Sequence, residues 1–323
     1  MKALCVFSGG LDSMLASQLV KAQDIEVLGL YFETPFFSSE KARKSAQTIN
    51  LPLKVIDLTG PHLKVVKNPR HGYGGNMNPC IDCHVLMLRT AGERLGKEKA
   101  DFLVTGEVLG QRPMSQNKKA LATVAAESGF EGLILRPLSA KQLPPTIPEE
   151  KGWIKRDELL DFSGRSRKPQ MQLAEKFRIK DYPSPAGGCL LTDPIFSRRL
   201  KDLLSSRPHP EVREIQLLKV GRHFRIGPRT KLVVGRNKAE NETILSLAKD
   251  ADGIVNVGSV PGPTVLVLGD LSPELEALAT SITVTYSDAE KNQPTQVTLS
   301  REGTEKVFVV KGGDKEVFKT LMV

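Results

Sequence analysis

The first 138 residues alternate short apolar runs with segments in which apolar side chains recur at helical spacing. Such runs predict buried strands, and the recurring side chains predict helices packed against them. The expected strands are 3–7, 27–33, 53–58, 101–106 and 132–138, and the expected helices are 11–21, 39–49, 79–98 and 115–128. This alternation is typical of an α/β fold with a parallel sheet, whose site lies at the carboxyl ends of the strands.

A proline-rich segment, 139–152, interrupts this pattern. Helices are then expected at 154–161, 168–177 and 194–204, followed by the linker 207–210, Arg-Pro-His-Pro. The remaining chain favours strands at 231–235, 253–257 and 264–268, helices at 239–249 and 273–281, and a hairpin from 297–299 and 307–310. We therefore predict a first domain at 1–150, a helical extension at 151–206 and a small α+β domain at 207–323.

Between the first expected strand and helix lies the string Ser-Gly-Gly-Leu-Asp-Ser, residues 8–13. A glycine turn that leads into a helix gathers unpaired backbone N–H groups, and the helix dipole is positive there. Both features favour a phosphate ligand. Ser8 and Ser13 add hydroxyl donors, and the Asp12 carboxylate is suited to hold Mg²⁺ against a phosphate chain. The spacing matches neither the Walker loop nor the dinucleotide-binding glycine motif.

Composition and charge narrow the choice of partner. The 323 residues carry a formal net charge of +9, which favours a polyanion, or else is only a basic surface. RNA fits better than a membrane, because neither an apolar run long enough to span a bilayer nor an amphipathic lipid-binding helix stands out. The chain enters its first strand directly, so we expect no signal peptide and a cytoplasmic location.

The four cysteines are too few and too scattered for a disulfide framework in a cytosolic protein. Cys5 falls in the first strand and is expected in the core. Cys80 and Cys83 share one face at the start of a helix, and Cys189 follows a Gly-Gly turn far along the chain. Three thiolates suit a [4Fe–4S] cluster or persulfide chemistry. The other interpretations are a zinc site completed by His84, and two buried cysteines at a helix start with an unrelated third.

The string at residues 8–13 resembles the PP-loop of the ATP pyrophosphatases, which split ATP into AMP and pyrophosphate. Together with Asn-Pro-Cys-x-x-Cys at 78–83 it looks like the tRNA thiouridine synthetases, over about residues 1–205. One Cys-x-x-Cys plus one remote cysteine is similar to their iron–sulfur-dependent branch. Residues 232–243 and 260–265 resemble the RNA-binding NFACT-R module. The resemblance implies an adenine nucleotide alpha-hydrolase-like fold and a C-terminal domain that holds RNA.

The resemblance also implies a reaction, an ATP-dependent tRNA sulfurtransferase activity. ATP and Mg²⁺ would adenylate a uridine oxygen of tRNA, and sulfur from a donor, held on a [4Fe–4S] cluster, would replace that oxygen. Cys80, Cys83 and Cys189 would carry the cluster and, with Asp12, the catalysis. The nucleotide would contact Ser8, Gly9, Gly10, Asp12, Ser13, Tyr31, Phe32, Gly106 and Arg136.

Four basic residues are expected to meet tRNA, with an affinity that falls steeply with salt: Arg112, Arg165, Arg167 and Lys168. A structural ion pair is an equal interpretation of Arg136, and a solvated helix start is another one for the run at 164–168. Three other functions stay open: a persulfide thiouridylase without a cluster, a different PP-loop adenylating ligase, and an RNA- or ribosome-binding nucleotide sensor. The sequence leaves the sulfur donor, the modified uridine and the oligomeric state open.

Overall fold

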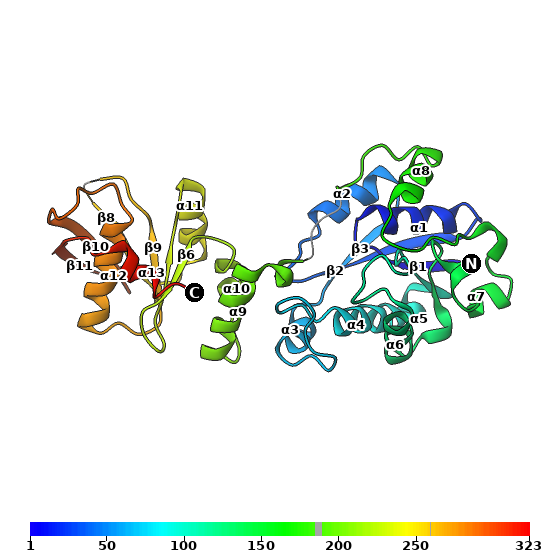
Figure 1. Ribbon diagram of the computed structural model, residues 1–323, viewed down its shortest axis with the longest axis horizontal. Helices are drawn as coiled ribbons and strands as arrows, with labels where there is room; N and C mark the ends of the chain where they lie inside the picture. Colours follow the sequence, from blue (N-terminus) through cyan, green and yellow to red (C-terminus); the bar gives the residue numbers. More distant parts are fainter. Residues whose placement is uncertain (185–188, 259) are drawn as a thin grey trace. The chain divides into compact units, whose positions relative to one another are not determined.

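The computed structural model describes residues 1–184, 189–258 and 260–323. The chain forms two compact units, Met1–Thr192 and Asp193–Val323 (Figure 1). In the part of the chain that the structure describes, none of the helices combines the length and the apolar character that a bilayer crossing requires. The predicted division into 1–150, 151–206 and 207–323 stays a prediction.

A five-stranded parallel sheet lies at the centre of the N-terminal unit, in the order β3-β2-β1-β4-β5. Its strands are β1 (Lys2–Val6), β2 (Glu26–Glu33), β3 (Leu53–Asp57), β4 (Phe102–Thr105) and β5 (Ile134–Leu135). In the register, Cys5 of β1 stands between Gly29 of β2 and Val104 of β4. The predicted α/β class with a parallel sheet is confirmed.

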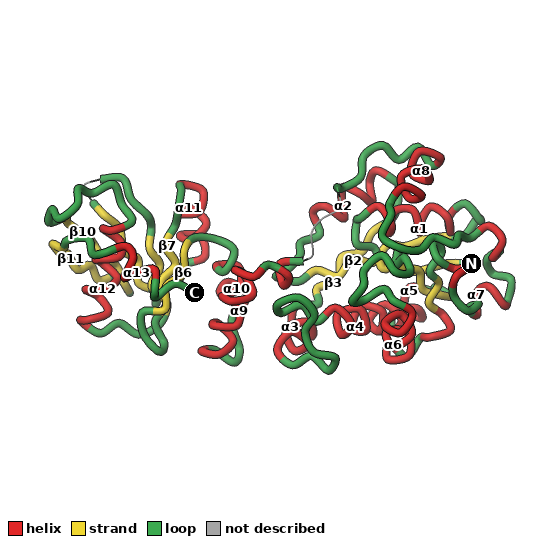
Figure 2. Tube along the Cα trace, in the orientation of Figure 1, coloured by secondary structure: helices red, strands yellow, loops and turns green. Residues whose placement is uncertain are grey.

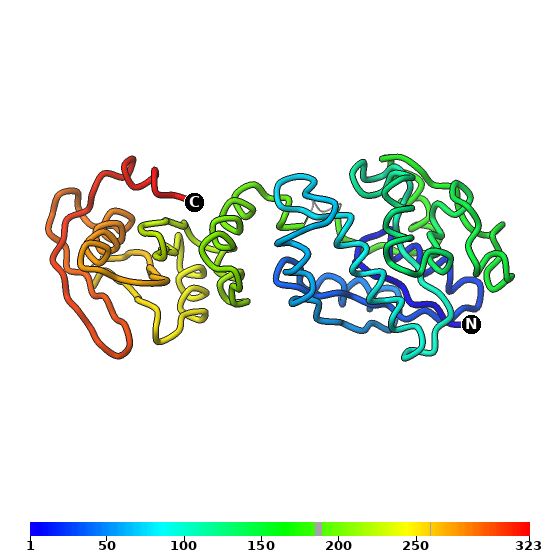
Figure 3. Tube along the Cα trace, turned by 90° about the horizontal axis from the view of Figure 1, so that it is seen from below, coloured from blue at the N-terminus to red at the C-terminus, as the bar shows by residue number. Residues whose placement is uncertain are grey.

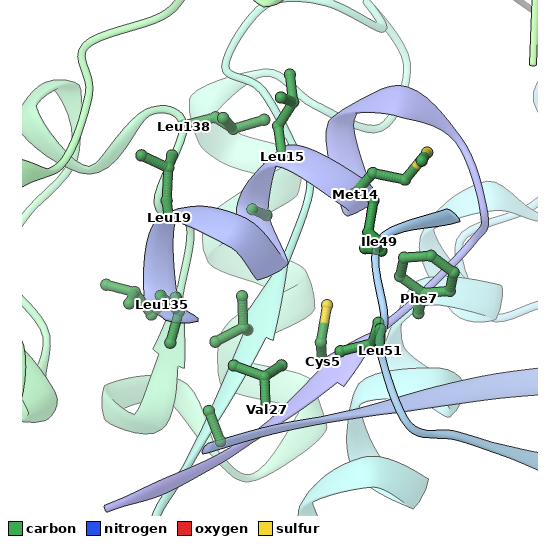
Figure 4. Packing of buried hydrophobic residues seen from close by; sticks show 14 of the residues in the cluster. Cys5, Phe7, Met14, Leu15, Leu19, Val27, Ile49, Leu51, Leu135 and Leu138 are labelled. Atoms are coloured by element: carbon green, nitrogen blue, oxygen red, sulfur yellow. The ribbon is translucent and has the colours of Figure 1, made fainter. Parts of the chain in front are cut away.

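Helices cover both faces of this sheet (Figure 2). Successive side chains of a strand point to opposite faces, and β1 follows this rule. Ala3 and Cys5 pack with α1, α2 and α8, whereas Leu4 packs with α4, α5 and α6. Figure 4 shows the first of these layers, with Met14, Leu15 and Leu19 of α1 over the sheet. The helices are α1 (Leu11–Lys21), α2 (Glu40–Thr48), α3 (Thr59–Lys67), α4 (Cys80–Gly92), α5 (Leu95–Glu98), α6 (Lys118–Ser128), α7 (Ile147–Glu150) and α8 (Lys168–Lys176).

Three expectations for this unit need correction. The single helix predicted at 79–98 is two helices, α4 and α5. The helix predicted at 154–161 is wrong: only a short 3-10 turn, Arg156–Glu158, forms there, because Ile154 and Leu159 are buried by an irregular segment. Helix α3 was not expected, since its Thr-Gly-Pro start is typical of a turn. Further 3-10 turns lie at Glu131–Leu133, Ala140–Gln142 and Leu190–Thr192.

The C-terminal unit is built on a six-stranded antiparallel sheet in the order β11-β10-β8-β9-β7-β6. Figure 3 shows the hairpin of β10 and β11, in orange and red, at one edge of this sheet. The strands are β6 (Arg222–Arg225), β7 (Lys231–Val234), β8 (Gly253–Val257), β9 (Val265–Leu268), β10 (Thr295–Arg301) and β11 (Thr304–Val310). The helices are α9 (Pro194–Ser206), α10 (Val212–Leu217), α11 (Lys238–Leu247), α12 (Pro273–Thr285) and α13 (Lys315–Lys319).

Two separate apolar clusters stabilise this unit. One contains Ile282 of α12 and Val297 of β10, and the other contains Ile244 of α11 and Leu266 of β9. Helices therefore cover both faces of the antiparallel sheet as well. This arrangement confirms the small α+β fold expected for the end of the chain.

Candidate active site

The loop at residues 8–13 connects the central strand β1 to α1. Gly10 is the N-cap of α1 and has no side chain to satisfy the first N–H groups of the helix. The Ser13 hydroxyl donates to the Gly10 carbonyl at 2.8 Å and lies 3.3 Å from the Ser8 hydroxyl oxygen. The backbone N–H of Gly10 donates to Ser8 Oγ at 3.3 Å. Both serine hydroxyls are thus held at the start of the helix.

Two close approaches fix this loop in place. Gly9 has a φ of +77°, and a Cβ atom there would lie 2.6 Å from Ala42 Cα of α2. A Cβ atom on Gly106, directly after β4, would lie 2.5 Å from the Ser13 backbone nitrogen. The space that a side chain on Gly106 would need is filled by the backbone of α1, so the small size of this residue permits the close packing. Its predicted contact with the nucleotide stays a prediction.

A cavity of about 800 Å³ opens beside this loop. It lies at the carboxyl ends of β1, β2 and β4, where the parallel sheet was expected to place its site. Nine residues predicted to bind ATP or to carry the chemistry line it: Ser8, Gly9, Gly10, Asp12, Ser13, Tyr31, Phe32, Gly106 and Cys189. Among the described lining residues, Cys80, Cys83 and Arg136 do not occur.

The two carboxylate oxygens of Asp12 differ in their hydrogen bonding. Gln111 Nε2 donates to Asp12 Oδ2 at 3.1 Å. The other oxygen, Oδ1, is buried and has no hydrogen-bond partner among the described residues. Burial raises the pKa of Asp12, although the hydrogen bond from Gln111 and the charges of Arg167 and Arg112 oppose that rise. A buried carboxylate oxygen without a partner, on the wall of a cavity, fits the oxygen ligand that Mg²⁺ needs.

Glu107 organises a buried charge network next to the cavity. Arg136 Nε donates to Glu107 Oε2 at 2.9 Å, and His84 Nδ1 lies 2.8 Å from Glu107 Oε1. Arg136 is buried, and its guanidinium also donates to the Leu121 carbonyl at 3.3 Å. Burial alone would raise the pKa of Glu107, but Arg136 and His84 lower it to about 2. Of the two interpretations of Arg136, this geometry favours the structural ion pair.

Of the candidate cysteines, Cys189 lies on the cavity wall, whereas Cys80 and Cys83 lie in the first turn of α4, outside the described lining. Cys189 lines the cavity, and the segment that follows it is tied to the loop before α4. Met77 donates its N–H to the Leu191 carbonyl at 3.2 Å, and Asn76 Nδ2 donates to the Thr192 carbonyl at 2.7 Å. The Gly-Gly turn at 187–188, expected to bring Cys189 in, lies outside the described residues.

Besides burial, electrostatic repulsion between thiolates raises the pKa of Cys83 and of Cys189. Burial raises the pKa of Cys83 most, and the nearby Cys189 and Cys80 raise it further. Burial also raises the pKa of Cys80 and of Cys189. Across the described ranges, however, there is no group of three or more His, Cys, Asp or Glu side chains arranged to hold a metal ion. The donor chemistry fits an iron–sulfur ligand set, whereas the arrangement is not that of a preformed metal site.

Sequence reasoning did not identify His62, which lies on the unexpected helix α3. Its Nε2 atom lies 2.9 Å from Cys83 Sγ, and its ring packs against Phe36 and Phe37. The residue is fully buried, and burial lowers its pKa to about 4, so the ring is neutral at pH 7. No local pattern pointed to this contact, because it joins residues on two separate helices.

Basic side chains extend the site outward. Arg112, Arg165 and Arg167 line the cavity, and Arg112 lowers the pKa of Cys80 through its charge. Lys168 is exposed at the first position of α8, outside the described lining. Basic side chains therefore form part of the cavity wall, and one of them, Arg112, acts electrostatically on Cys80.

Comparisons with known proteins match the two ends of the chain to different families. Residues 1–142 match the model of the family described as thiamine biosynthesis protein (ThiI). Residues 221–321 match the model described as NFACT protein RNA binding domain. These matches confirm the resemblance to PP-loop tRNA thiouridine synthetases and to the NFACT-R module.

Two of the curated relatives that this chain resembles are tRNA-modifying proteins by name. A probable tRNA sulfurtransferase of Alkaliphilus metalliredigens is 31% identical over 143 residues, which are 43% of this chain and 36% of that protein. A tRNA-specific 2-thiouridylase MnmA of Karelsulcia muelleri is 25% identical over 173 residues, 49% of this chain and 45% of that protein. The chain thus spans less than half the length of these two relatives.

The sequence identity to a solved structure is lower than the identity to these two relatives. The U34-tRNA thiolase NcsA from Methanococcus maripaludis, solved with its [4Fe-4S] cluster, has 17% identity and a TM-score of 0.31. The match covers 68% of this chain and 70% of that chain. At this TM-score the likeness supports no inference on function.

Proposed function

We propose that this protein is an ATP-dependent tRNA sulfurtransferase that replaces a uridine carbonyl oxygen with sulfur. One observation carries the proposal: Cys189 lines the same cavity as the PP-loop residues 8–13. Sulfur transfer needs an activated oxygen and a sulfur-bearing group within reach of one substrate atom. The family matches at both ends of the chain support tRNA as that substrate.

The phosphates of ATP would bind at the loop. The first N–H groups of α1 and the hydroxyls of Ser8 and Ser13 supply the donors, and the positive end of the helix favours the charge. The free Oδ1 atom of Asp12 would hold Mg²⁺ against the phosphate chain. The uridine oxygen would attack the α-phosphate, and pyrophosphate would leave. Charge neutralisation and positioning dominate such phosphoryl chemistry.

The activated carbon would then accept sulfur, and AMP would leave with the former uridine oxygen. Cys80, Cys83 and Cys189 are the residues that would hold a [4Fe–4S] cluster. When bound, such a cluster supplies one iron without a protein ligand, where a sulfide can bind. Arg112, Arg165 and Arg167 would neutralise tRNA phosphates at the mouth of the cavity.

A specific contact favours a second candidate, a persulfide enzyme without a cluster. Neutral His62 sits 2.9 Å from Cys83, and the described residues show no preformed metal group. The neutral His62 ring fixes the Cys83 thiol in place, while burial raises the pKa of Cys83 and lowers that of His62, so the contact orients a thiol and does not itself produce a thiolate.

In this route a sulfane-sulfur donor would place its outer sulfur on one of Cys83 and Cys189. That sulfur would bond to the activated carbon and displace AMP, and the other thiol would then attack the inner sulfur, which releases thiouridine and leaves a Cys83–Cys189 disulfide for a thiol reductant to reopen.

The decisive experiment follows thiouridine in tRNA. The protein is purified without oxygen and incubated with ATP, Mg²⁺, sulfide and unmodified tRNA, and the nucleosides are analysed by mass spectrometry. We expect thiouridine and stoichiometric pyrophosphate in the wild type, and a loss of thiouridine of at least ~100-fold in Cys189→Ser. The matched control is Cys5→Ala, because Cys5 is buried in the core under α1, away from the cavity.

Iron analysis of the same samples separates the two candidates. Bound iron and sulfide that fall together in Cys80→Ala support the cluster. An iron-free, colourless protein that still makes thiouridine from sulfide contradicts the cluster. The persulfide route is supported if the iron-free protein makes thiouridine only when a sulfane-sulfur donor and a thiol reductant replace sulfide, because sulfide forms a persulfide only with an oxidant. Pyrophosphate release that does not depend on tRNA, with no thiouridine formed, would contradict the proposed function and favour another adenylating ligase.

A further inference from the structure

The segment from the end of β4 to the start of α6 forms part of the wall of the cavity beside the PP-loop. Three uncharged polar side chains of this segment line the cavity: Thr105, Gln111 and Gln116. The Thr105 hydroxyl donates to Glu107 at 3.0 Å, and Gln111 donates to Asp12 at 3.1 Å. Gln116 differs from both, because its side chain makes no hydrogen bond to any residue that the structure describes.

The side chain of Gln116 is buried although it lies on the cavity wall. Only 7% of the residue is exposed, and its Oε1 atom has no hydrogen-bond partner in the described parts of the chain. A buried amide loses its hydrogen bonds to water, so an unpaired amide costs stability unless a ligand or an ordered water molecule pairs with it. At this position, a ligand in the cavity can supply the missing partner.

The backbone on both sides of this amide is held in place. Gln116 donates its N–H to the Arg112 carbonyl at 2.8 Å, and its own carbonyl accepts the Gly110 N–H at 2.6 Å. The next residue, Asn117, caps α6 by accepting the Ala120 N–H at 2.9 Å. The Gln116 side chain therefore starts from a fixed turn, which limits the conformational entropy that a ligand contact would cost.

The turn that carries Gln116 contacts both parts of the proposed chemistry. Gln111 binds Asp12 of the PP-loop, and the charge of Arg112 acts on Cys80. In the proposed function, an oxygen of the substrate base must reach the α-phosphate, and the carbon next to it must reach the sulfur. The base must therefore lie along this turn, within reach of the PP-loop and of the cysteines.

Adenine is the other base that enters this cavity under the proposed function. Its expected contacts, Tyr31 and Phe32, belong to β2, whereas Gln116 follows β4. These two strands flank β1 on opposite sides in the sheet. The strand order therefore favours the substrate base over adenine as the partner of Gln116.

Uracil has an edge that matches an amide. Its N3–H is a donor between two carbonyl acceptors, and an amide offers an acceptor oxygen beside a donor NH₂ group. Pairing with N3–H and one carbonyl leaves the other carbonyl free for activation. Because N3 is bonded to both carbonyl carbons, this holds whichever oxygen is replaced. A rotated amide also pairs with cytosine, so the contact orients the base without excluding cytosine.

We propose that Gln116 binds the imide edge of the substrate uracil, with Oε1 accepting N3–H and Nε2 donating to the carbonyl that is not activated. The inference rests on the proposed function for the identity of the base. Gln116 thereby turns the remaining carbonyl towards the α-phosphate. This contact is made to the base alone, so its loss leaves the contacts to ATP and to tRNA phosphates in place.

Two substitutions in the full-length protein test this assignment. Gln116→Met removes the amide on the cavity wall. The control, Gln18→Met, removes a half-buried amide of α1 that donates to the Ile49 carbonyl at 3.0 Å, outside the described lining. Replacing an unpaired buried amide by an apolar chain of similar length should not lower the thermal midpoint of Gln116→Met. A midpoint more than ~5 °C below wild type would assign Gln116 a structural role and overturn the proposal.

Binding of uridine 5′-monophosphate is measured by ligand-observed NMR, in the presence of an ATP analogue with a methylene group between the α- and β-phosphates. We expect Gln116→Met to bind this nucleotide at least ~10-fold more weakly than wild type, and Gln18→Met to stay within ~3-fold. Methylation of N3 should weaken binding to the wild type at least ~10-fold, but binding to Gln116→Met by no more than ~3-fold, because the two changes remove one contact.

Three results overturn the contact. The first is uridine 5′-monophosphate binding that is absent from the wild type or equal in the two variants, which leaves water as the partner of the amide. The second is weaker binding of the ATP analogue to Gln116→Met with unchanged uridine 5′-monophosphate binding, which assigns the amide to adenine. The third is an effect of N3 methylation that is as large in Gln116→Met as in the wild type.

Thiouridine analysis at a tRNA concentration below KM separates this inference from the proposed function. If nucleotide binding depends on Gln116 but the wild type makes no thiouridine, the proposed function fails and the uracil contact stands. If thiouridine forms, and Gln116→Met makes as much of it as Gln18→Met, the uracil contact fails and the function stands.

Discussion

At the scale of single residues, burial and neighbouring positive charges have opposite effects on the pKa of Glu107. A buried carboxylate is stable only when charged partners compensate for the lost water. Arg136, from the segment after β5, and His84, from α4, both reach it. The network therefore joins two strand ends and one helix beside the cavity. His84 also lines the cavity, so the network orients a side chain that a substrate can contact.

The lowered pKa of Glu107 predicts a dependence of stability on acid. In the folded protein this pKa is about 2, below the value of about 4.3 in an unfolded chain. The ionised carboxylate therefore stabilises the fold fully above pH ~4.3, and this contribution is lost as the pH falls towards 2. Urea unfolding at pH 5, 4 and 3 should show a steeper loss of unfolding free energy in the wild type than in Glu107→Gln.

The control for this prediction is the substitution of a carboxylate that is exposed on the surface. Glu175→Gln replaces an exposed carboxylate of α8 and should keep the steep wild-type dependence. An unchanged slope in Glu107→Gln would show that other carboxylates govern the acid response.

At the scale of elements, the PP-loop depends on contacts with α2 and with the end of β4. Gly9 meets the backbone of Ala42, and Gly106 meets the backbone of Ser13. In addition, the Ser45 hydroxyl of α2 donates to the Gly9 carbonyl at 2.8 Å. The position of residues 8–13 is thus determined by the layers of the fold as much as by the loop itself.

Two adjacent glycines give a matched pair for testing this support. Gly9→Ala puts a Cβ atom 2.6 Å from the Ala42 backbone at a φ of +77°, which should cost about 1–3 kcal/mol of unfolding free energy. Gly10→Ala has ordinary backbone angles, and its Cβ atom meets only Ser8 Oγ at 3.5 Å, so its stability should stay close to wild type. Urea unfolding of both variants checks this. Equal losses in the two variants would contradict the packing argument.

Much of the N-terminal fold was predictable because the apolar runs of β1, β2 and β4 are buried on both faces and strongly patterned. The sequence also predicted that Ser8, Phe32 and Gly106 would meet at one edge of the sheet, and all three line the cavity. It did not reveal the contact of His62 with Cys83, nor did it decide between the two roles of Arg136. Both depend on long-range packing, which periodicity does not encode.

At the scale of the whole molecule, the chain divides into two compact units, and each contains buried apolar clusters of its own. In the C-terminal unit, α9 adds the buried side chains Phe196, Leu200 and Leu203. Each sheet is also complete within its unit, because no strand of the described chain pairs across the boundary. A separate core and a closed set of strand pairs are the features of a domain that folds alone.

Residues 193–323, expressed alone, should therefore fold cooperatively. We expect mixed helix and strand signals in circular dichroism and a single thermal transition. A matched fragment, 236–323, lacks β6 and β7, which pair with each other, and β7 also pairs with β9, so it should not fold. A broad, non-cooperative transition in the longer fragment would mean that its stability depends on the N-terminal unit.

The place of β1 in its sheet has a consequence for synthesis on the ribosome. β1 is made before its two partners, β2 and β4, and its Ala3 lies opposite Phe102 of β4. Gly106 then closes against Ser13. The nascent chain therefore carries an unfinished loop at residues 8–13 until β4 has emerged, and this long-range closure is slow compared with local helix formation. Under the proposed function, a partly made chain would thereby be kept from engaging ATP.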